Sequence, residues 1–557
     1  MIKKGISKHI ISALLGLAII LLPFLSREVS GMFRNEVSVL YAIAGMLAAG
    51  FACLMVKLFR KSRSTVNIIS IDILLLIFSG WYVINFFIRS WPLTDWWPLI
   101  ALAFFLLAYI LGRQIRDNTI ILGAILLSGT LQAAVAAGQI FGITGTQSWM
   151  YDVTGSFGGP AFLGMLLALA MVAGTELLIK ARQWSCKIVM TVLMIFIGFV
   201  LIHADSRTSW IAAIAGVCYL ILGIPRIRQR IGLLWARSTV KFALLAIVVT
   251  CCAALYFYKK DSADGRLLIW RVSAGMIADN PITGVGVGKF PAEYMKYQAL
   301  YFEKHPDSKF SELADNISYP YNEFLRILCE LGLIGSALVL AMAWIVSKNN
   351  RYIPILICWV VLAMFSFPAS LPVAIAIFAL SLNGGSVIRS LSINRYFVVI
   401  LVLFILLAGK ITCNLIKAYR APDVETNNYR IGYSASYIRY AAKQLTREKN
   451  TANLPVLKEY AKIFRTSEFY TDLGLLYKDS GDTTTAKYYL KYASDMVPSR
   501  IYPRYCLFEL YRDGNQPDSA VIVAKTIINM TPKVENTTTI KTQARTKEYL
   551  EKIEEID

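Results

Sequence analysis

Two arginines, Arg207 and Arg266, carry the clearest chemical signal in this chain. Arg207 stands where two long apolar runs meet, and Arg266 opens an amphipathic stretch. An arginine keeps its charge beside a membrane, and its planar guanidinium matches the oxygens of a phosphate group. Although the two residues are far apart in the sequence, we predict that they converge on one diphosphate.

Each arginine also has a simpler interpretation. Arg207 would reach to the membrane interface or pair with Asp205, which is close to it in the sequence. Arg266 would be a turn residue neutralised by Asp264. The interpretations differ in whether the two guanidinium groups meet, which depends on the tertiary structure.

Candidates for proton transfer precede the apolar run that begins near residue 328. Glu323 is the acidic side chain placed near the start of that run, where it could act as a general base toward an attacking hydroxyl. Otherwise Glu323 is a helix terminus that pairs with Arg326. His305 is the sole histidine of the preceding loop, and a lone exposed histidine is more often a bystander than a catalyst.

Metal and nucleotide chemistry are not predicted, and no cofactor is expected. The nine cysteines are scattered without metal-ligand spacing, and the chain has only three histidines. The glycines of the run 284–289 lack the spacing of either phosphate-binding glycine loop. We expect this run to break a helix after Pro281 and to turn the chain.

The composition predicts a polytopic membrane protein. Of the 557 residues, 56% are hydrophobic and 17% are charged, which excludes an ordinary soluble protein. A membrane-spanning helix needs about 20 apolar residues, and we predict an all-α bundle of about 12–13 spans. The candidate spans are 10–25, 37–58, 68–88, 96–112, 119–141, 161–179, 187–203, 209–224, 239–257, 328–346, 353–367, 370–388 and 396–415.

Basic residues gather in alternate loops between these spans. The loops that contain Lys57, Arg113 and Lys348 all fall on one side, whereas the opposite short loops carry few basic residues. Since basic loops stay cytoplasmic, the long insertion 258–327 is predicted to lie outside. This pattern accounts for the net charge of +21 without nucleic-acid binding. If the run 370–388 did not cross the membrane, everything after it would change sides.

Four parts of the chain are predicted. They are an N-terminal transmembrane bundle (1–257), a loop with an amphipathic helix (258–327), C-terminal transmembrane helices (328–415) and a soluble helical-repeat domain (416–557). In the last part, Leu473, Tyr477 and Ala486 recur 34 residues later as Leu507, Tyr511 and Ala520. A 34-residue period of paired helices is typical of tetratricopeptide repeats, whose concave surface binds protein partners.

Several short motifs stand in a characteristic order. They are Ser206-Arg207, Gly265-Arg266, Asp279-Asn280-Pro281, Gly288-Lys289-Phe290 and Asn322-Glu323-Phe324-Leu325. Together with the large outer loop, this set resembles the O-antigen ligase (Wzy-C type) family of bacterial membrane glycosyltransferases. The resemblance covers residues 190–350 and does not extend to the C-terminal domain.

The resemblance implies that a glycan is transferred from undecaprenyl pyrophosphate to an acceptor hydroxyl. The reaction would take place at the periplasmic face of the bacterial inner membrane, without metal or nucleotide. Arg207 and Arg266 would bind the diphosphate, and Asn322 would belong to the same substrate-binding set. The C-terminal domain would also be periplasmic by our count of spans.

The chain departs from the family at one position. In such enzymes a histidine before the asparagine activates the acceptor, and here that residue is Tyr321. A tyrosine, with an ordinary pKa near 10, is a poor base at neutral pH. The catalytic candidates are therefore Tyr321 itself, Glu323 and His305.

Several alternatives for the acceptor and the activity stay open. The acceptor would be a lipid A core sugar in a ligase, the growing glycan in a polymerase, or a protein hydroxyl in an O-oligosaccharyltransferase. Outside the family, the chain would be a transporter of lipid-linked sugars or an inactive scaffold that recruits partners through its repeats. All of these would have membrane lipids as neighbours.

Overall fold

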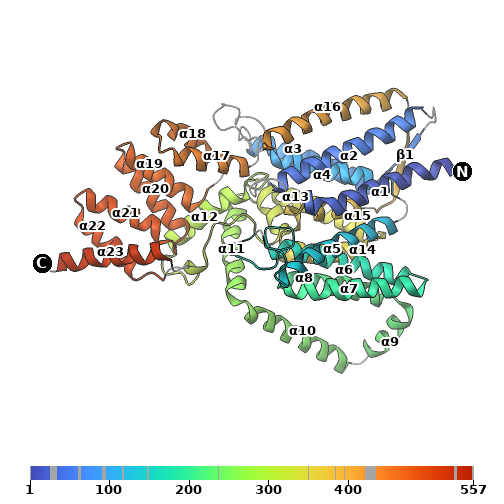
Figure 1. Ribbon diagram of the computed structural model, residues 1–557, viewed down its shortest axis with the longest axis horizontal. Coiled ribbons are helices and arrows are strands. Elements are labelled where there is room, and N and C mark those ends of the chain that lie inside the picture. The colour runs from blue at the N-terminus through green and yellow to red at the C-terminus, as the bar shows by residue number, and fades with distance from the viewer. Residues whose placement is uncertain are drawn as a thin grey trace.

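The computed structural model confirms an all-α membrane-protein architecture (Figure 1). It describes residues 2–554 except 26–33, 60–63, 91–95, 116–117, 147, 149, 236–237, 349, 383, 394, 421–434, 464 and 532–535. A helical membrane bundle occupies one half of the molecule, and a second group of helices lies beyond one end of the bundle (Figure 1).

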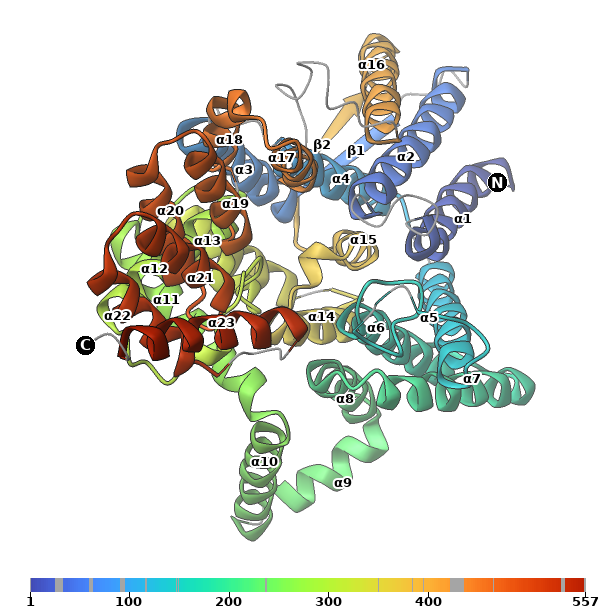
Figure 2. The same ribbon diagram turned by 60° about the vertical axis from the view of Figure 1, so that its left-hand side comes forward.

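The apolar runs of the sequence form the helices of the bundle. These are α1 (Ile2–Leu25), α2 (Arg34–Phe59), α3 (Ser70–Asn85), α4 (Trp97–Gly112), α5 (Thr119–Ile140), α6 (Pro160–Lys180), α7 (Trp184–His203), α8 (Arg207–Leu222), α10 (Ser238–Tyr258), α13 (Glu323–Lys348), α14 (Ile353–Phe365), α15 (Pro372–Ser381) and α16 (Arg395–Arg420). Between α8 and α10 stands the basic helix α9 (Pro225–Trp235). Among the described residues, six helical segments are long and apolar enough to cross a membrane, in α3, α5, α6, α7, α13 and α16. Helices α9 and α10 run outside the main group (Figure 2).

Small residues bring the central helices close together. A Cβ atom on Gly129 of α5 would lie 2.3 Å from the Cβ of Ala170 on α6. A Cβ atom on Gly164 of α6 would lie 2.7 Å from the hydroxyl of Ser209 on α8. Within a bilayer, helices associate through such close contacts because lipid is as apolar as the side chains. The packing of α8 on α6 sets the position of Arg207, the first residue of α8.

A two-stranded antiparallel ladder of β1 (Ser64–Ile69) and β2 (Val387–Ile393) lies at the far end of the bundle, which is the end away from the C-terminal helices (Figure 1). Arg113 Nη2 donates a hydrogen bond to Asn67 O at the same end, over 2.7 Å. Loops predicted to share one side of the membrane therefore lie together.

The run 370–388 differs from its prediction as one continuous span. It is helical only in α15, and Gly385, with a φ of 103°, then turns the chain into β2. Helix α14 ends beside α8, because Thr208 Oγ1 donates to Phe365 O over 3.2 Å. Since β2 pairs with β1 at the far end, α15 carries the chain back across the bundle.

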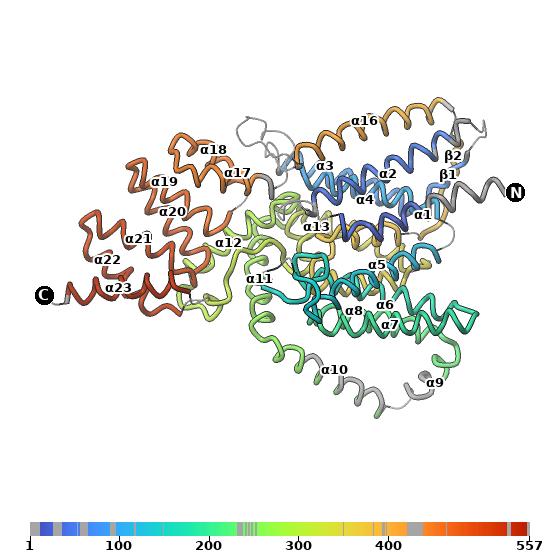
Figure 3. The backbone as a smooth tube through the Cα atoms, in the orientation of Figure 1, coloured from blue at the N-terminus to red at the C-terminus, as the bar shows by residue number. Residues whose placement is uncertain are grey.

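The insertion and the C-terminal helices share one hydrophobic core. The insertion contributes α11 (Lys260–Asp279), α12 (Phe290–Lys304) and η2 (Ser311–Leu313), and the path of the chain through them is seen in Figure 3. The C-terminal helices are α17 (Ala435–Arg447), η5 (Thr451–Asn453), α18 (Leu454–Tyr460), α19 (Ser467–Asp479), α20 (Thr483–Met496), α21 (Ile501–Asp513), α22 (Pro517–Ile528) and α23 (Thr537–Glu554). Met295 and Phe302 of α12 pack in the same cluster as Leu473 and Leu490 of the C-terminal helices. This core is distinct from the core of the membrane bundle.

Candidate active site

Arg207 lies beside the end of α10. Asp205 has a left-handed φ of 47° and reverses the chain between α7 and α8. Its carboxylate lies 2.5 Å from Lys259 Nζ, so the carboxylate expected to pair with Arg207 is engaged by a lysine. Arg207 Nη1 donates a hydrogen bond to Leu255 O. The start of α8 is thereby fastened to the junction of α10 and α11.

Arg266 extends from α11 across the ring of Tyr321. Its guanidinium carbon lies 5.2 Å from the centre of that ring, a cation–π contact. Asp264, the other expected partner, accepts a hydrogen bond from Tyr256 over 2.6 Å. In the described part of the chain, no carboxylate forms an ion pair with Arg207 or Arg266.

The two arginines are close enough to influence each other. Burial lowers the pKa of Arg266, and the positive charge of Arg207 lowers it further. The ring of Tyr321 acts in the opposite direction. Two half-buried guanidinium groups thus lie near one another, which is the arrangement of a site for an anion.

Tyr321 occupies a strained turn at the entrance to α13. Its φ of 54° is unusual for a residue other than glycine, and such strain gathers at functional sites. The turn is fixed on both sides, because Phe367 contacts the Tyr321 ring edge-on at 5.3 Å and Trp270 Nε1 donates to Pro320 O over 3.0 Å. Burial raises the pKa of Tyr321 more than Arg266 lowers it. The hydroxyl therefore stays protonated at neutral pH and suits a hydrogen-bond donor better than a base.

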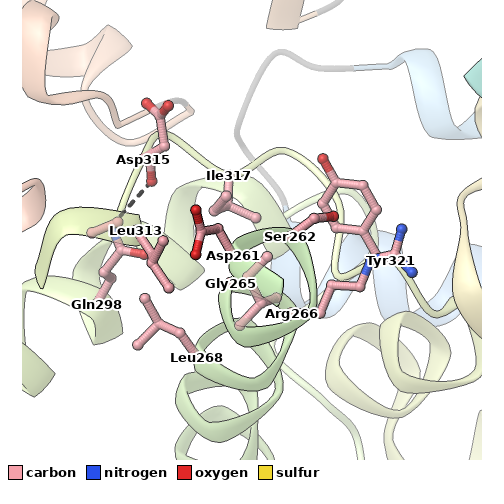
Figure 4. A pocket seen from close by; sticks show the side chains of 12 residues that line it. Asp261, Ser262, Gly265, Arg266, Leu268, Gln298, Leu313, Asp315, Ile317 and Tyr321 are labelled. Carbon is pink, nitrogen blue, oxygen red and sulfur yellow. Dashed lines mark hydrogen bonds between the residues drawn. The ribbon is translucent and has the colours of Figure 1, made fainter. Parts of the chain in front are cut away.

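A cavity of about 310 Å³ adjoins Arg266 and Tyr321 (Figure 4). Small-molecule sites usually measure roughly 300–1,000 Å³, so this cavity would hold only a small group. Its walls are Asp261, Ser262, Gly265, Arg266, Leu268, Ile269, Gln298, Leu313, Ala314, Asp315, Ile317 and Tyr321. Gln298 and Leu313 lie at one end of the view in Figure 4, Arg266 and Tyr321 lie at the other, and Asp261 lies between them.

The glycine run after α11 braces this site against α13. Helix α11 ends at Asp279, two residues before Pro281, where the break was predicted, and Val285 N then donates to Cys329 O over 2.8 Å. That carbonyl is available because α13 kinks at Gly332, whose φ is 66°. A Cβ atom on Gly332 would lie 2.2 Å from Ile282 O, so the crossing requires glycine. The run is a structural joint between the insertion and the bundle.

Glu323 faces the bundle and does not line the cavity. Its Oε1 accepts a hydrogen bond from Ala369 N over 3.0 Å, and its Oε2 lies 3.6 Å from Arg326 Nη1. Arg326 Nε also lies 3.5 Å from Glu330 Oε1. Glu323 thus makes the pairing with Arg326 that was the simpler of its two predicted roles.

Asn322 and His305 also lie outside the cavity lining. Asn322 Oδ1 accepts a hydrogen bond from Leu325 N over 3.0 Å and so caps the first turn of α13. His305 is exposed after the end of α12, and its ring stacks on Tyr301 with centroids 4.7 Å apart. Of the six residues singled out from the sequence, Arg266 and Tyr321 line the cavity and Arg207 lies near Arg266.

Four polar residues of the cavity, Asp261, Ser262, Gln298 and Asp315, were not singled out from the sequence. Asp261 lies in the first turn of α11, and no local pattern distinguishes it from a solvated acidic residue. Gln298 lies on the apolar face of α12 between Met295 and Phe302, which are both buried. A polar side chain at a buried position of a helix is a signal that could have been found.

Residues 191–340 match a family model described as O-Antigen ligase. The matched segment includes α8, α11, α12 and most of α13, and therefore both arginines and the cavity residues from Asp261 to Tyr321. No curated protein and no solved structure matches the chain. In this segment the chain is similar to the O-antigen ligases, which points to a multi-pass membrane enzyme that transfers glycans.

Proposed function

We propose that the protein transfers a glycan from a lipid pyrophosphate, undecaprenyl pyrophosphate, to an acceptor hydroxyl. One observation carries this proposal: Arg207 lies close enough to Arg266 for its charge to act on it, and among the described residues neither arginine is within ion-pair distance of a carboxylate. Two half-buried like charges repel each other, and a diphosphate bound between them would remove that repulsion. The similarity to O-antigen ligases supports the same chemistry.

In the proposed reaction the acceptor oxygen attacks the anomeric carbon of the donor sugar. A new carbon–oxygen bond forms as the bond between that carbon and the diphosphate breaks, and the acceptor proton passes to solvent. The negative charge that grows on the diphosphate would be stabilised by Arg207 and Arg266. Fixed donors aimed at a developing charge are among the strongest contributions to catalysis.

We propose that this site faces the periplasm. The basic residues Arg113 and Arg351 lie at the end of the bundle that carries the ladder, and basic loops stay cytoplasmic. The arginine pair lies where α8 begins and α14 ends, away from that ladder. A transporter would instead place its site near the middle of the membrane.

The C-terminal helices are proposed to be a tetratricopeptide-like domain. Leu473 and Leu507 occupy equivalent buried positions on α19 and α21, and Ala486 and Ala520 do so on α20 and α22. The four helices pack in sequence as neighbouring pairs. This arrangement is what a 34-residue repeat requires, and it would offer a surface to a protein partner.

Transfer by purified protein from an undecaprenyl-pyrophosphate-linked glycan tests the proposal. Arg207→Ala should abolish transfer while the variant stays inserted in the membrane, and Arg226→Ala, an exposed arginine of α9, should behave as wild type. Full transfer by Arg207→Ala would refute the clamp. The glycans of a deletion strain would then identify the acceptor, by loss of long chains from lipid A, by chains of single repeats, or by unglycosylated proteins.

A further inference from the structure

Gln298 of α12 is fully buried, and among the described residues only the nitrogen of its side-chain amide forms hydrogen bonds. Its Nε2 donates to Asp315 O over 3.1 Å and to Met496 O over 2.6 Å. Among the described residues, none donates a hydrogen bond to its Oε1. A buried acceptor without a donor is destabilising. Gln298 lines the same cavity as Arg266, at its other end (Figure 4). A ligand that carries a donor would satisfy this atom.

The rest of the cavity has a matching character. The carboxylate of Asp261 is exposed and lies between Gln298 and Tyr321 in Figure 4. Leu268 and Ile317 supply apolar walls. The cavity thus presents hydrogen-bond acceptors beside an apolar surface, and a sugar ring presents hydroxyl donors beside an apolar C–H face.

We propose that this cavity binds a neutral or amino sugar at the end of the acceptor glycan. Its hydroxyls would donate to Gln298 Oε1 and to the Asp261 carboxylate, which holds an adjacent hydroxyl toward Tyr321 and Arg266. The same carboxylate repels an acidic sugar or a phosphate. The assignment of this sugar as the acceptor rests on the proposed function, whereas its binding does not.

The C-terminal domain supports one wall of this sugar site from behind. Met496 at the end of α20 holds the Gln298 amide in place, and Arg500 Nη2 lies 3.1 Å from Asp315 Oδ1. Arg500 also pairs with Glu468 of α19. Asp315, in the segment 313–317 that lines the cavity, is therefore held by the C-terminal helices.

Saccharide binding to the full-length protein in detergent tests this inference. The probes are fluorescently labelled chitotetraose, its deacetylated form and tetragalacturonate. Asp261→Ala and Gln298→Met should each weaken binding of the first two probes by about tenfold, the expected loss for one hydrogen bond to a ligand. Glu303→Ala, an exposed acidic residue of α12 outside the cavity lining, should bind them as wild type does.

The outcomes separate this inference from the proposed function. If the protein has no transfer activity but binds the probes, and Asp261→Ala weakens that binding, the sugar site stands and the transferase proposal is rejected. Arg207→Ala should abolish transfer and leave binding of the probes unchanged. Three results would overturn the sugar site. They are no binding of any probe, equal binding by wild type and Asp261→Ala, and preference for tetragalacturonate. Because Asp261 is exposed, this variant answers the question even if Gln298→Met fails to fold.

Discussion

Two arginine sites of this protein, at Arg266 and at Arg326, are both withdrawn from bulk water but differ in their neighbours. Arg326 lies within 3.6 Å of Glu323 and within 3.5 Å of Glu330, whose side chains are each 7% exposed. Arg266 stacks on Tyr321 and has the positive charge of Arg207 beside it.

The difference separates an ion-paired charge from one that we propose binds a ligand. Removing one partner of a buried ion pair is costly, so the Arg326 network stabilises the first turns of α13, where Glu323 also accepts a hydrogen bond from Ala369 N. An unmatched positive charge is unfavourable until an anion binds, so the arginine pair is suited to a ligand. Sequence motifs cannot make this distinction, because the residue type is arginine in both places and the difference lies in the residues around it.

The largest expected effect is on catalysis, from Arg266→Ala. Transfer should fall by about a hundredfold or more, because a clamp on the leaving diphosphate is lost. The thermal unfolding midpoint should change little, since no ion pair is broken. Arg266→Lys should keep part of the activity because the charge remains without the planar fork. Wild-type turnover by Arg266→Ala in the transfer assay would place the arginine outside the reaction.

Arg326→Met should lower stability, which Arg266→Ala leaves almost unchanged. It leaves Glu323 and Glu330 buried without a cation, and the free energy of unfolding should fall by about 3 kcal/mol. The measurement is chemical unfolding in detergent followed by tryptophan fluorescence. Adding Glu323→Gln and Glu330→Gln to this variant should restore much of the stability. If the triple variant is no more stable than Arg326→Met, charge is not what the network contributes.

Gly332→Ala tests the joint that connects the two arginine sites. The left-handed φ of 66° and the approach of Ile282 O to 2.2 Å from an added Cβ should lower the free energy of unfolding by about 1–3 kcal/mol. Gly198→Ala is the matched control, because a Cβ on that glycine of α7 meets nothing within 4 Å. Equal unfolding midpoints for the two variants would contradict this account of the kink.

A smaller effect is expected from Tyr321→Phe, which keeps the ring beneath Arg266. Burial raises the pKa of Tyr321, so its hydroxyl remains protonated below its ordinary pKa and no charge is lost on titration there. Transfer should fall by only a few fold, and the pH profile between about pH 6 and 9 should keep its shape. Tyr321→Leu, which removes the ring, should be the more damaging change. If the activity of wild type rises with pH and Tyr321→Phe loses that rise, the tyrosine would instead be the base.

The smallest effect is expected from His305→Ala. This histidine is exposed, and its ring stacks on Tyr301 and bonds to the Tyr301 carbonyl. Both turnover in the transfer assay and the unfolding midpoint should equal those of wild type. A tenfold loss of turnover would restore His305 as a catalytic candidate.

Local patterns in the sequence were sufficient for several conclusions. Apolar runs predict the membrane helices because a bilayer demands continuous hydrophobic length, whatever their neighbours are. Charge in the loops predicted that the loops with Lys57 and Arg113 would share one side of the membrane, and Arg113 is hydrogen-bonded to Asn67 of β1, a strand that was not predicted. The residue types at Arg207 and Arg266 predicted an anion site because guanidinium chemistry does not depend on the fold.

The tertiary structure alone decided which of these residues act together. Apolar periodicity on α11 and α12 shows that they bury one face, but only packing shows that α12 meets α20 of the C-terminal domain whereas α11 meets α13 of the bundle. The tertiary structure also decided the partners of the carboxylates. Lys259 forms an ion pair with Asp205, and Tyr256 and Ala369 donate hydrogen bonds to Asp264 and Glu323. Sequence determines what each segment must bury and which charges it carries, whereas pairing depends on contacts between distant segments, which leave no local pattern.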